Sequence, residues 1–290
     1  MSQLLSSALA KTTKLAKGRH LQLLCNTSVR AFSTPSGDAS SATSSAAQGA
    51  PSGPPKLVVL GGRGFVGSHV CQEAVSAGLS VVGMSRGGTP PLVQESWVDS
   101  VEWVRGNALE PQTLAPYLQG AHAVISCIGG FGTNQQMLKI NGAANVSAIE
   151  AAKAAGVPRF VYISATIPNI PGIETLLEGY VRGKQTAEQA LRTHFPSTGV
   201  ALRPGVIYGD RVISASLTVP LGLAFQPLEM LLGKLGADKA QQLSGLPLLG
   251  AAFVPPVSVQ AVARAAVQAA MGANVPGGVI DVWELASKYK

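Results

Sequence analysis

The sequence feature that most constrains the fold is an apolar run followed at once by closely spaced glycines. Residues 57–60 are all apolar, include two valines, and are bounded by Pro55 and Gly61. This pattern is typical of a short strand that is buried on both faces. Residues 65–77 then carry apolar side chains at helical spacing. The sequence therefore predicts a strand, a glycine turn and a helix in immediate succession.

A unit of this kind is suited to bind the pyrophosphate of a dinucleotide. The first glycines let the backbone approach the phosphates, the last lets the helix pack on the strand, and the helix N-terminus supplies N–H groups and partial positive charge. The alternative is a glycine turn that binds no phosphate, but the strand and helix on either side favour binding. We expect these residues to form the site: Gly61, Gly62, Arg63, Gly64, Phe65, Val66 and Gly67.

The positive charge of the chain is concentrated at its N-terminus. A formal net charge of +7 would ordinarily suggest a nucleic-acid-binding protein. Five of the 22 lysines and arginines lie in residues 1–32, and removing them leaves 17 basic residues against 15 acidic ones. The first acidic residue is Asp38. The charge therefore belongs to a leader, and we expect no nucleic-acid partner.

Residues 1–32 have the composition of an organelle transit peptide, since they are rich in Ser, Thr, Leu and Ala and lack acids. Arg30-Ala-Phe-Ser33 resembles the site cut by the mitochondrial processing peptidase, with cleavage after Phe32. We expect mitochondrial import, with the chloroplast as the alternative. Residues 33–55 are a low-complexity segment of Ser, Ala, Gly, Pro and Gln, and are expected to form a disordered linker.

Strand and helix patterns alternate through the rest of the core. Further strands are expected at 79–86, 101–107, 122–130, 159–164 and 200–209, and helices at 110–118, 136–156 and before 195. Such alternation predicts an α/β fold, a doubly wound parallel-sheet Rossmann fold over residues 56–209. The three cysteines have no metal-binding spacing, and we expect no metal site.

The end of the second expected strand bears on which nucleotide binds. An NAD enzyme places an acid there on the adenosine ribose diol, whereas this chain has Ser85 and Arg86. A guanidinium and a hydroxyl suit a 2′-phosphate, which a carboxylate would repel. We therefore expect NADP(H) to be favoured over NAD(H); the alternative is an arginine that is simply solvated at a strand end.

Several motifs together resemble the extended and atypical short-chain dehydrogenase/reductase superfamily over residues 56–265. They are Gly61/Gly64/Gly67, Gly106-Asn107, Asn141-Gly-Ala-Ala-Asn145, Arg203-Pro-Gly-Val-Ile-Tyr-Gly209 and the segment 257–263. The glycine turn and residues 82–88 look most like a mitochondrial branch that includes an accessory reductase of coenzyme Q biosynthesis and an accessory subunit of respiratory complex I. Asn107 departs from the superfamily's usual Asp, which alters the expected adenine contact.

The resemblance implies roles for a Tyr-x-x-x-Lys pair, Tyr180 and Lys184, which share one face of a helix. The ammonium would lower the phenol pKa and hold the ribose, and the phenol would give or take a proton. Ser164 would hydrogen-bond the substrate oxygen, and Asn141 would support a water network. Ile128 and Gly129 end a strand where the nicotinamide half is expected. Residues 165–171 depart from the superfamily's active-site loop.

Residues 210–290 are expected to form a small, apolar, mostly helical substrate region, or lid. Prolines interrupt both apolar runs, 217–232 and 243–254, so no transmembrane helix is expected. The region is either a packed subdomain, a slot for an isoprenoid-like tail, or a face that rests on the inner mitochondrial membrane. An amphipathic helix at 258–271 and a strand at 278–282 are expected to return to the core.

Two functions of different classes remain open. One is an NADP(H)-dependent oxidoreductase that acts on an apolar carbonyl or hydroxyl compound, such as a quinone precursor in ubiquinone biosynthesis. The other is a non-catalytic nucleotide-binding subunit of complex I or of a membrane-associated quinone-synthesis complex, in which the nucleotide stabilises the fold. A Tyr-x-x-x-Lys pair alone does not decide between them.

Overall fold

The computed structural model describes residues 53–167, 172–214, 217–220, 229–232, 234, 236–246, 250–272 and 275–290. The expected transit peptide (1–32) and the linker up to residue 52 lie outside the described residues. So do residues 168–171 of the loop that departs from the superfamily's pattern.

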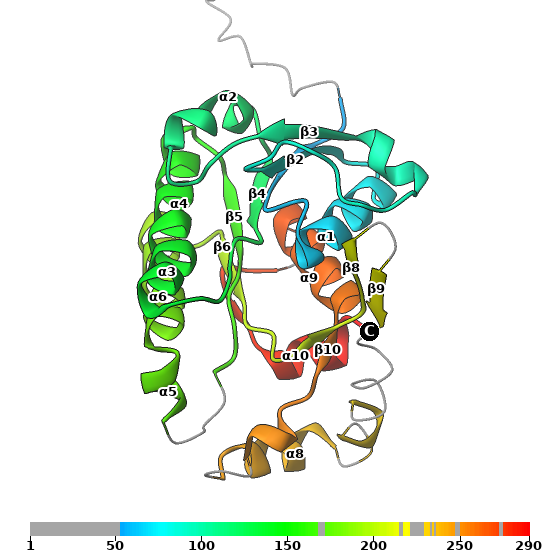
Figure 1. The fold of residues 1–290 in the computed structure, drawn as a ribbon, viewed down its shortest axis with the longest axis vertical. Coiled ribbons are helices and arrows are strands. Elements are labelled where there is room, and N and C mark those ends of the chain that lie inside the picture. The colour runs from blue at the N-terminus through cyan, green and yellow to red at the C-terminus, as the bar shows by residue number, and fades with distance from the viewer. Residues whose placement is uncertain are drawn as a thin grey trace, which may run out of the picture. The chain divides into compact units, whose positions relative to one another are not determined.

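A seven-stranded parallel sheet forms the centre of the fold (Figure 1). Its spatial order is β11-β6-β5-β4-β1-β2-β3, and every pairing between neighbours is parallel. This confirms the doubly wound α/β prediction, because the chain runs outward from β1 in both directions. The strands are β1 Lys56–Leu60, β2 Ser80–Ser85, β3 Val101–Arg105, β4 Ala123–Ser126, β5 Arg159–Ile163, β6 Gly199–Leu202 and β11 Gly278–Ile280.

Helices cover both faces of the sheet, and the strand side chains alternate between them. On one face, Leu57 and Val59 pack with α1 (Phe65–Ser76), α9 (Val259–Met271) and α10 (Val282–Lys288). On the other face, Val58 and Leu60 pack with α2 (Ala115–Leu118), α4 (Ala144–Ala154) and α6 (Glu178–His194). Figure 1 shows α3 (Asn134–Met137) on the same side as α4 and α6. The near-continuous apolar strands are thus buried on both faces.

The helix expected over 136–156 is not one regular helix. It consists of α3, a π-helical turn Leu138–Ala143, and α4. The Asn145 side chain donates hydrogen bonds to the carbonyls of Ile140 and Asn141, at 3.2 and 3.0 Å, within this turn. Asparagine amides that bond to nearby backbone compete with the regular α-helical pattern. The hydrophobic spacing gave no sign of this interruption.

The chain after β6 differs most from expectation. The strand expected over 200–209 ends at Leu202, and β7 (Ile207–Tyr208) pairs instead with β10 (Val257–Ser258). A hairpin of β8 (Asp210–Ser214) and β9 (Leu217–Pro220) follows. The smaller elements are the 3₁₀ turns Ser96–Ser100, Pro111–Thr113 and Gly250–Phe253 and the helices α5 (Ile173–Leu176) and α8 (Ala237–Ser244).

The last helices complete the core. The amphipathic helix expected at 258–271 is confirmed as α9: nine of its 13 residues are buried against the core, while Gln260 and Gln268 are exposed on the opposite face. The strand expected at 278–282 is shorter, because β11 ends at Ile280. Helix α10, which was not expected, follows it directly. Asp281 caps this helix, since its side chain accepts hydrogen bonds from the N–H groups of Trp283 and Glu284. Within the described residues, no helix has the length and apolarity needed to span a membrane.

Candidate active site

The glycine turn after β1 lies directly on the neighbouring strands. Gly61 has a φ of +78°, and its N–H and that of Gly62 donate to the Met84 carbonyl at 2.8 and 3.0 Å. A Cβ on Gly61 would lie 3.2 Å from the carbonyl carbon of Cys127, and one on Gly67 would lie only 2.1 Å from the Gly61 carbonyl oxygen. A side chain at Gly61 or Gly67 would clash with this backbone, so the turn requires glycine at both positions and exposes its backbone to the adjacent cleft.

The N-terminus of α1 opens beside this turn. Gly64 occupies the N-cap position and has no side chain to cap the helix, and the first turn of α1 contains no acid. The first N–H groups of a helix have no partner within it and carry partial positive charge. Gly64 and Phe65 line the adjacent cleft. The backbone cradle and the helix end together fit a pyrophosphate.

A cleft of about 1190 Å³ runs along the carboxyl ends of β1 to β4. Small-ligand sites are typically about 300–1,000 Å³, so there is room for a dinucleotide and part of a second ligand. Nine of the expected cofactor-binding residues line it: Gly61, Arg63, Gly64, Phe65, Ser85, Arg86, Asn107, Ile128 and Gly129. The expected residues Gly62, Val66 and Gly67 are not among the lining residues; the backbone of Gly67 instead packs on that of Gly61.

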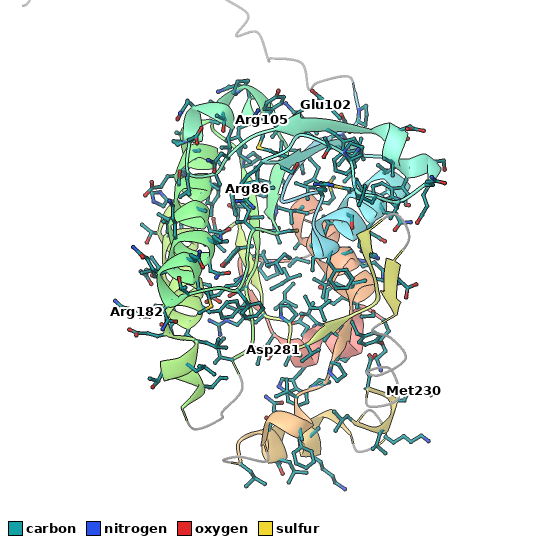
Figure 2. The ribbon with its side chains drawn as sticks, viewed as in Figure 1. Arg86, Glu102, Arg105, Arg182, Met230 and Asp281 are labelled. Atoms are coloured by element: carbon teal, nitrogen blue, oxygen red, sulfur yellow. The ribbon has the colours of Figure 1, made fainter. Side chains whose placement is uncertain are left out.

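Two arginines approach the cleft near the end of β2. Arg86 is exposed and lies at the carboxyl end of that strand (Figure 2). Arg63 donates from Nε to the Pro90 carbonyl at 3.2 Å, which joins the glycine turn to the segment after β2. Ser85 accepts the Gly88 N–H on its hydroxyl at 3.1 Å. This corner of the cleft therefore combines positive charge with a hydroxyl, as a phosphate group requires.

Asn107 is used largely to build the turn after β3. Its Nδ2 donates to Glu110 Oε1 at 2.7 Å, and its Oδ1 accepts from the Leu109 N–H at 3.2 Å. The Oδ1 bond forms an Asx turn, and the Nδ2 bond adds a side-chain contact within it. Asn107 thus lines the cleft with its amide already paired.

Buried asparagines hold the segment after β4, where the nicotinamide half is expected. Asn141 is fully buried, and its Oδ1 accepts from the Gly130 N–H at 3.1 Å. Its Nδ2 donates to the carbonyls of Gly130 and Met137, both at 2.9 Å. Ser126 donates to Asn145 Oδ1 at 2.6 Å. The Asn141 amide thus fixes backbone, where the sequence predicted support of a water network.

Tyr180 and Lys184 lie together beside this segment. The Lys184 ammonium is buried, donates to the Ile163 carbonyl at 2.7 Å, and sits 5.7 Å from the centroid of the Tyr180 ring. A Cβ on Gly129 would lie 3.4 Å from Lys184 Nζ, so the absence of a side chain there leaves the lysine adjacent to the cleft. The Phe131 ring stacks on Tyr180 with centroids 5.0 Å apart. Neither Tyr180 nor Lys184 is itself among the lining residues.

The protonation tendencies differ from the expected ones. Burial lowers the pKa of Lys184 to about 8, although Cys127 and Glu188 oppose this shift. Burial also raises the pKa of Tyr180, whereas a lowering by the ammonium was expected. The correction has a geometric reason: Lys184 sits over the face of the ring and bonds to the Ile163 carbonyl.

Ser164 is engaged by a partner that the sequence did not suggest. Its hydroxyl is buried and donates to Glu188 Oε1 at 2.6 Å, and Arg203 donates to the same carboxylate at 2.9 Å from Nε and 2.5 Å from Nη2. Burial by itself raises the pKa of Glu188, but the hydrogen bonds from Arg203 and Ser164 outweigh it and lower the pKa. The structure shows no hydrogen bond between Ser164 and Tyr180 among the described residues.

Sequence reasoning missed Phe131 and Glu188 altogether, and it named Asn145 and Arg203 in motifs without predicting their contacts. Glu188 follows Lys184 by four residues, which places both on one helix face and was a usable signal. Phe131 stands among glycines, which marks a segment where the backbone approaches something closely, but no spacing pointed to Tyr180.

Comparison with known proteins decides the family. A sequence model described as NAD(P)H-binding matches residues 61–218, just over half of the chain. The chain belongs to this NAD(P)H-binding family. The chloroplastic protein At1g32220 of Arabidopsis thaliana is 44% identical over 218 residues, which cover 74% of this chain and 71% of that protein. The match to the family model confirms the NAD(P)-binding part of the resemblance expected from the sequence.

More distant relatives match over shorter spans. MIOREX complex component 2 of Saccharomyces cerevisiae is 38% identical over 79 residues, 26% of this chain and 28% of that protein. The 2-alkyl-3-oxoalkanoate reductase of Stenotrophomonas maltophilia is 31% identical over 173 residues, 53% of this chain and 51% of that enzyme. The chain thus spans about half or less of these two relatives.

Solved structures of related fold include the UDP-glucuronic acid 4-epimerase of Bacillus cereus in complex with NAD. It aligns with a TM-score of 0.52 and 21% identity, over 78% of this chain and 76% of that one. At this identity the likeness concerns the fold, which is the Rossmann-like sheet described above.

Proposed function

We propose that this NAD(P)-binding protein is an NADP(H)-dependent oxidoreductase that acts on an apolar carbonyl or hydroxyl compound. The observation that carries the proposal is that Lys184 lies beside Gly129, which lines the cleft, and that Tyr180 lies next to Lys184 and stacks on Phe131, another lining residue. A titratable pair with shifted pKa values beside a cleft is characteristic of a catalytic site.

Each part of the cleft has a task in this proposal. Gly61, Gly64 and the N-terminus of α1 bind the pyrophosphate, while Ser85 and Arg86 bind the 2′-phosphate. Bound NADP(H) supplies the hydride-transfer chemistry. Lys184 holds a ribose hydroxyl, and the Tyr180 hydroxyl donates a proton to the substrate oxygen or removes one from it.

The proposed substrate is apolar. The Phe131 ring, 74% exposed, stacks on Tyr180, and Leu176, 72% exposed, ends the short helix α5 just before α6. The reductase relative is named for a carbonyl substrate with alkyl substituents, which supports this class. A quinone precursor with an isoprenoid-like tail, as in ubiquinone biosynthesis, remains the specific candidate, and residues 210–290 would enclose its tail.

The second candidate function is a nucleotide-binding subunit that has no turnover of its own. The support is that one relative is named as a component of a complex, MIOREX. In that role the protein would join a membrane-associated complex, either a quinone-synthesis complex or respiratory complex I. We propose import into the mitochondrion through residues 1–32, with the chloroplast, where the Arabidopsis relative is named, as the alternative.

Turnover with NADPH and a panel of apolar ketones and quinones tests the proposal, with Tyr180→Phe as the variant. We expect kcat to fall about 10²–10⁴-fold without the phenol hydroxyl, while the Kd for NADPH and the melting temperature stay unchanged. Equal turnover in the two proteins would refute the role of Tyr180. NADPH binding without any turnover would favour the subunit.

A further inference from the structure

The Lys184 ammonium lies between two aromatic rings, only one of which belongs to the Tyr-x-x-x-Lys pair. The other is Tyr162 on β5, which is fully buried and whose ring centroid lies 4.8 Å from Lys184 Nζ. This is closer than the 5.7 Å to Tyr180. A cation over an aromatic face is stabilised by the ring quadrupole, most strongly where water is excluded.

Through its hydroxyl, Tyr162 is also linked to the segment that lines the cleft. The hydroxyl donates to the Asn141 backbone carbonyl at 3.2 Å. The Asn141 side chain in turn holds both the N–H and the carbonyl of Gly130. Tyr162 is therefore in contact with Lys184 on one side and, through Asn141, with the Gly129–Phe131 segment on the other.

We propose that Tyr162 is a positioning residue with two separable tasks: its ring holds the charged Lys184 ammonium beside Gly129, and its hydroxyl holds the Gly129–Phe131 segment through Asn141. The role of Lys184 in turnover rests on the function proposed above, but both tasks concern groups whose state can be measured without turnover. Neither task was suggested by the sequence, in which Tyr162 is one apolar residue of a buried strand.

The groups that face Lys184 explain why the ring matters. They are Cys127 after β4, Tyr162 on β5, and Tyr180 and Glu188 on α6. Burial favours the neutral amine, and Cys127 and Glu188 favour the ammonium. The rings and the Ile163 carbonyl also favour the ammonium, because both present negative charge to it. Removing the nearer ring, that of Tyr162, should therefore favour the neutral amine further and lower the pKa of Lys184.

The test uses the full-length protein and three variants. Tyr162→Phe keeps the ring and removes the hydroxyl, and Tyr162→Leu removes both. Phe160→Leu is the matched control, because Phe160 is equally buried, lies two residues earlier on the same strand face, and packs on Phe195 instead of a lysine. ¹³C NMR of lysine-labelled protein, assigned with Lys184→Met, follows the titration of Lys184, and calorimetry gives the Kd for NADPH.

We expect Tyr162→Leu to lower the pKa of Lys184 by about one unit, as the loss of a buried cation–π contact implies. Tyr162→Phe should leave that pKa near its starting value but weaken NADPH binding about fivefold, the equivalent of one hydrogen bond. Phe160→Leu should change neither quantity. If Tyr162→Leu does not fold, Tyr162→Met replaces it, since methionine is long and has no ring.

Two results would overturn the proposal. Equal shifts of the Lys184 pKa in Tyr162→Leu and Phe160→Leu would show that any cavity near the strand has this effect. Unchanged NADPH affinity in Tyr162→Phe would remove the task of the hydroxyl. Failure of the proposed function is seen separately, as the absence of turnover in the unmutated protein while these shifts persist.

Discussion

Replacement of Arg203 by Met should destabilise the protein through the carboxylate that it leaves behind. The side chain of Glu188 is 6% exposed, and Arg203 holds it by two hydrogen bonds. Removing one partner of a buried pair costs about 3–5 kcal/mol. Arg203 is itself 41% exposed, and Ser164 and Arg192 would remain near the carboxylate, so we expect a loss of about 2–3 kcal/mol in the free energy of unfolding.

A matched control lies on the same helix. Arg182 pairs with Glu178 at 2.9 Å, but their side chains are 66% and 54% exposed, and Figure 2 shows Arg182 at the outer side of α6. Arg182→Met should therefore cost about 0.5 kcal/mol or less. Urea denaturation at pH 7 measures both values. A difference below about 1 kcal/mol between the two variants would refute the reasoning, because it would equate a buried pair with an exposed one.

The pH dependence of the same pair has a definite sign. The pKa of Glu188 is lower in the folded protein than in the unfolded chain. The ionised carboxylate therefore contributes to the free energy of unfolding above the pKa of the unfolded chain, and this contribution is lost as the pH falls through the pKa of the folded protein. Without Arg203, burial would raise that pKa, since burial is the largest influence on it. The difference in the free energy of unfolding between the wild type and Arg203→Met should therefore shrink as the pH falls from 7 to 4.5. A constant difference would contradict this.

Three further predictions follow from the site. Gly67→Ala should cost about 1–3 kcal/mol of stability and abolish nucleotide binding, because its Cβ would meet the Gly61 carbonyl; an unchanged melting temperature and Kd would refute this. Between pH 8 and 10.5 the wild type should gain up to about 3 kcal/mol relative to Lys184→Met, as the buried ammonium loses its proton; parallel stability curves would refute this. Asn141→Leu should speed amide hydrogen exchange at Gly130, and unchanged protection would show that Asn141 does not hold this segment.

The parts of the fold that the sequence predicted are those with a strong local signature. The apolar run before Gly61 and the glycine spacing after it determine β1, the turn and α1, because positive φ and close helix packing admit little else. The glycine motif also predicted a binding site at the end of β1, and the structure has a cleft there, at the point between β1 and β4 where the strand order reverses.

The parts that the sequence did not predict depend on contacts between distant residues. The π-helical turn arises from asparagine amides that bond to backbone, and hydrophobic spacing is blind to these bonds. The engagement of Ser164 by Glu188 needs β5, β6 and α6 to be assembled first. The raised pKa of Tyr180 follows from burial, which a four-residue motif does not reveal.

Calorimetric titration of the purified protein with NADPH and with NADH, repeated on Arg86→Ala, tests the central claim most directly. The account predicts that NADPH binds more tightly than NADH, and that Arg86→Ala weakens NADPH binding while leaving NADH binding nearly unchanged, because the guanidinium lies at the corner suited to a 2′-phosphate. Equal weakening of both nucleotides would contradict the NADP(H) preference, and binding of neither would contradict the cleft as a nucleotide site.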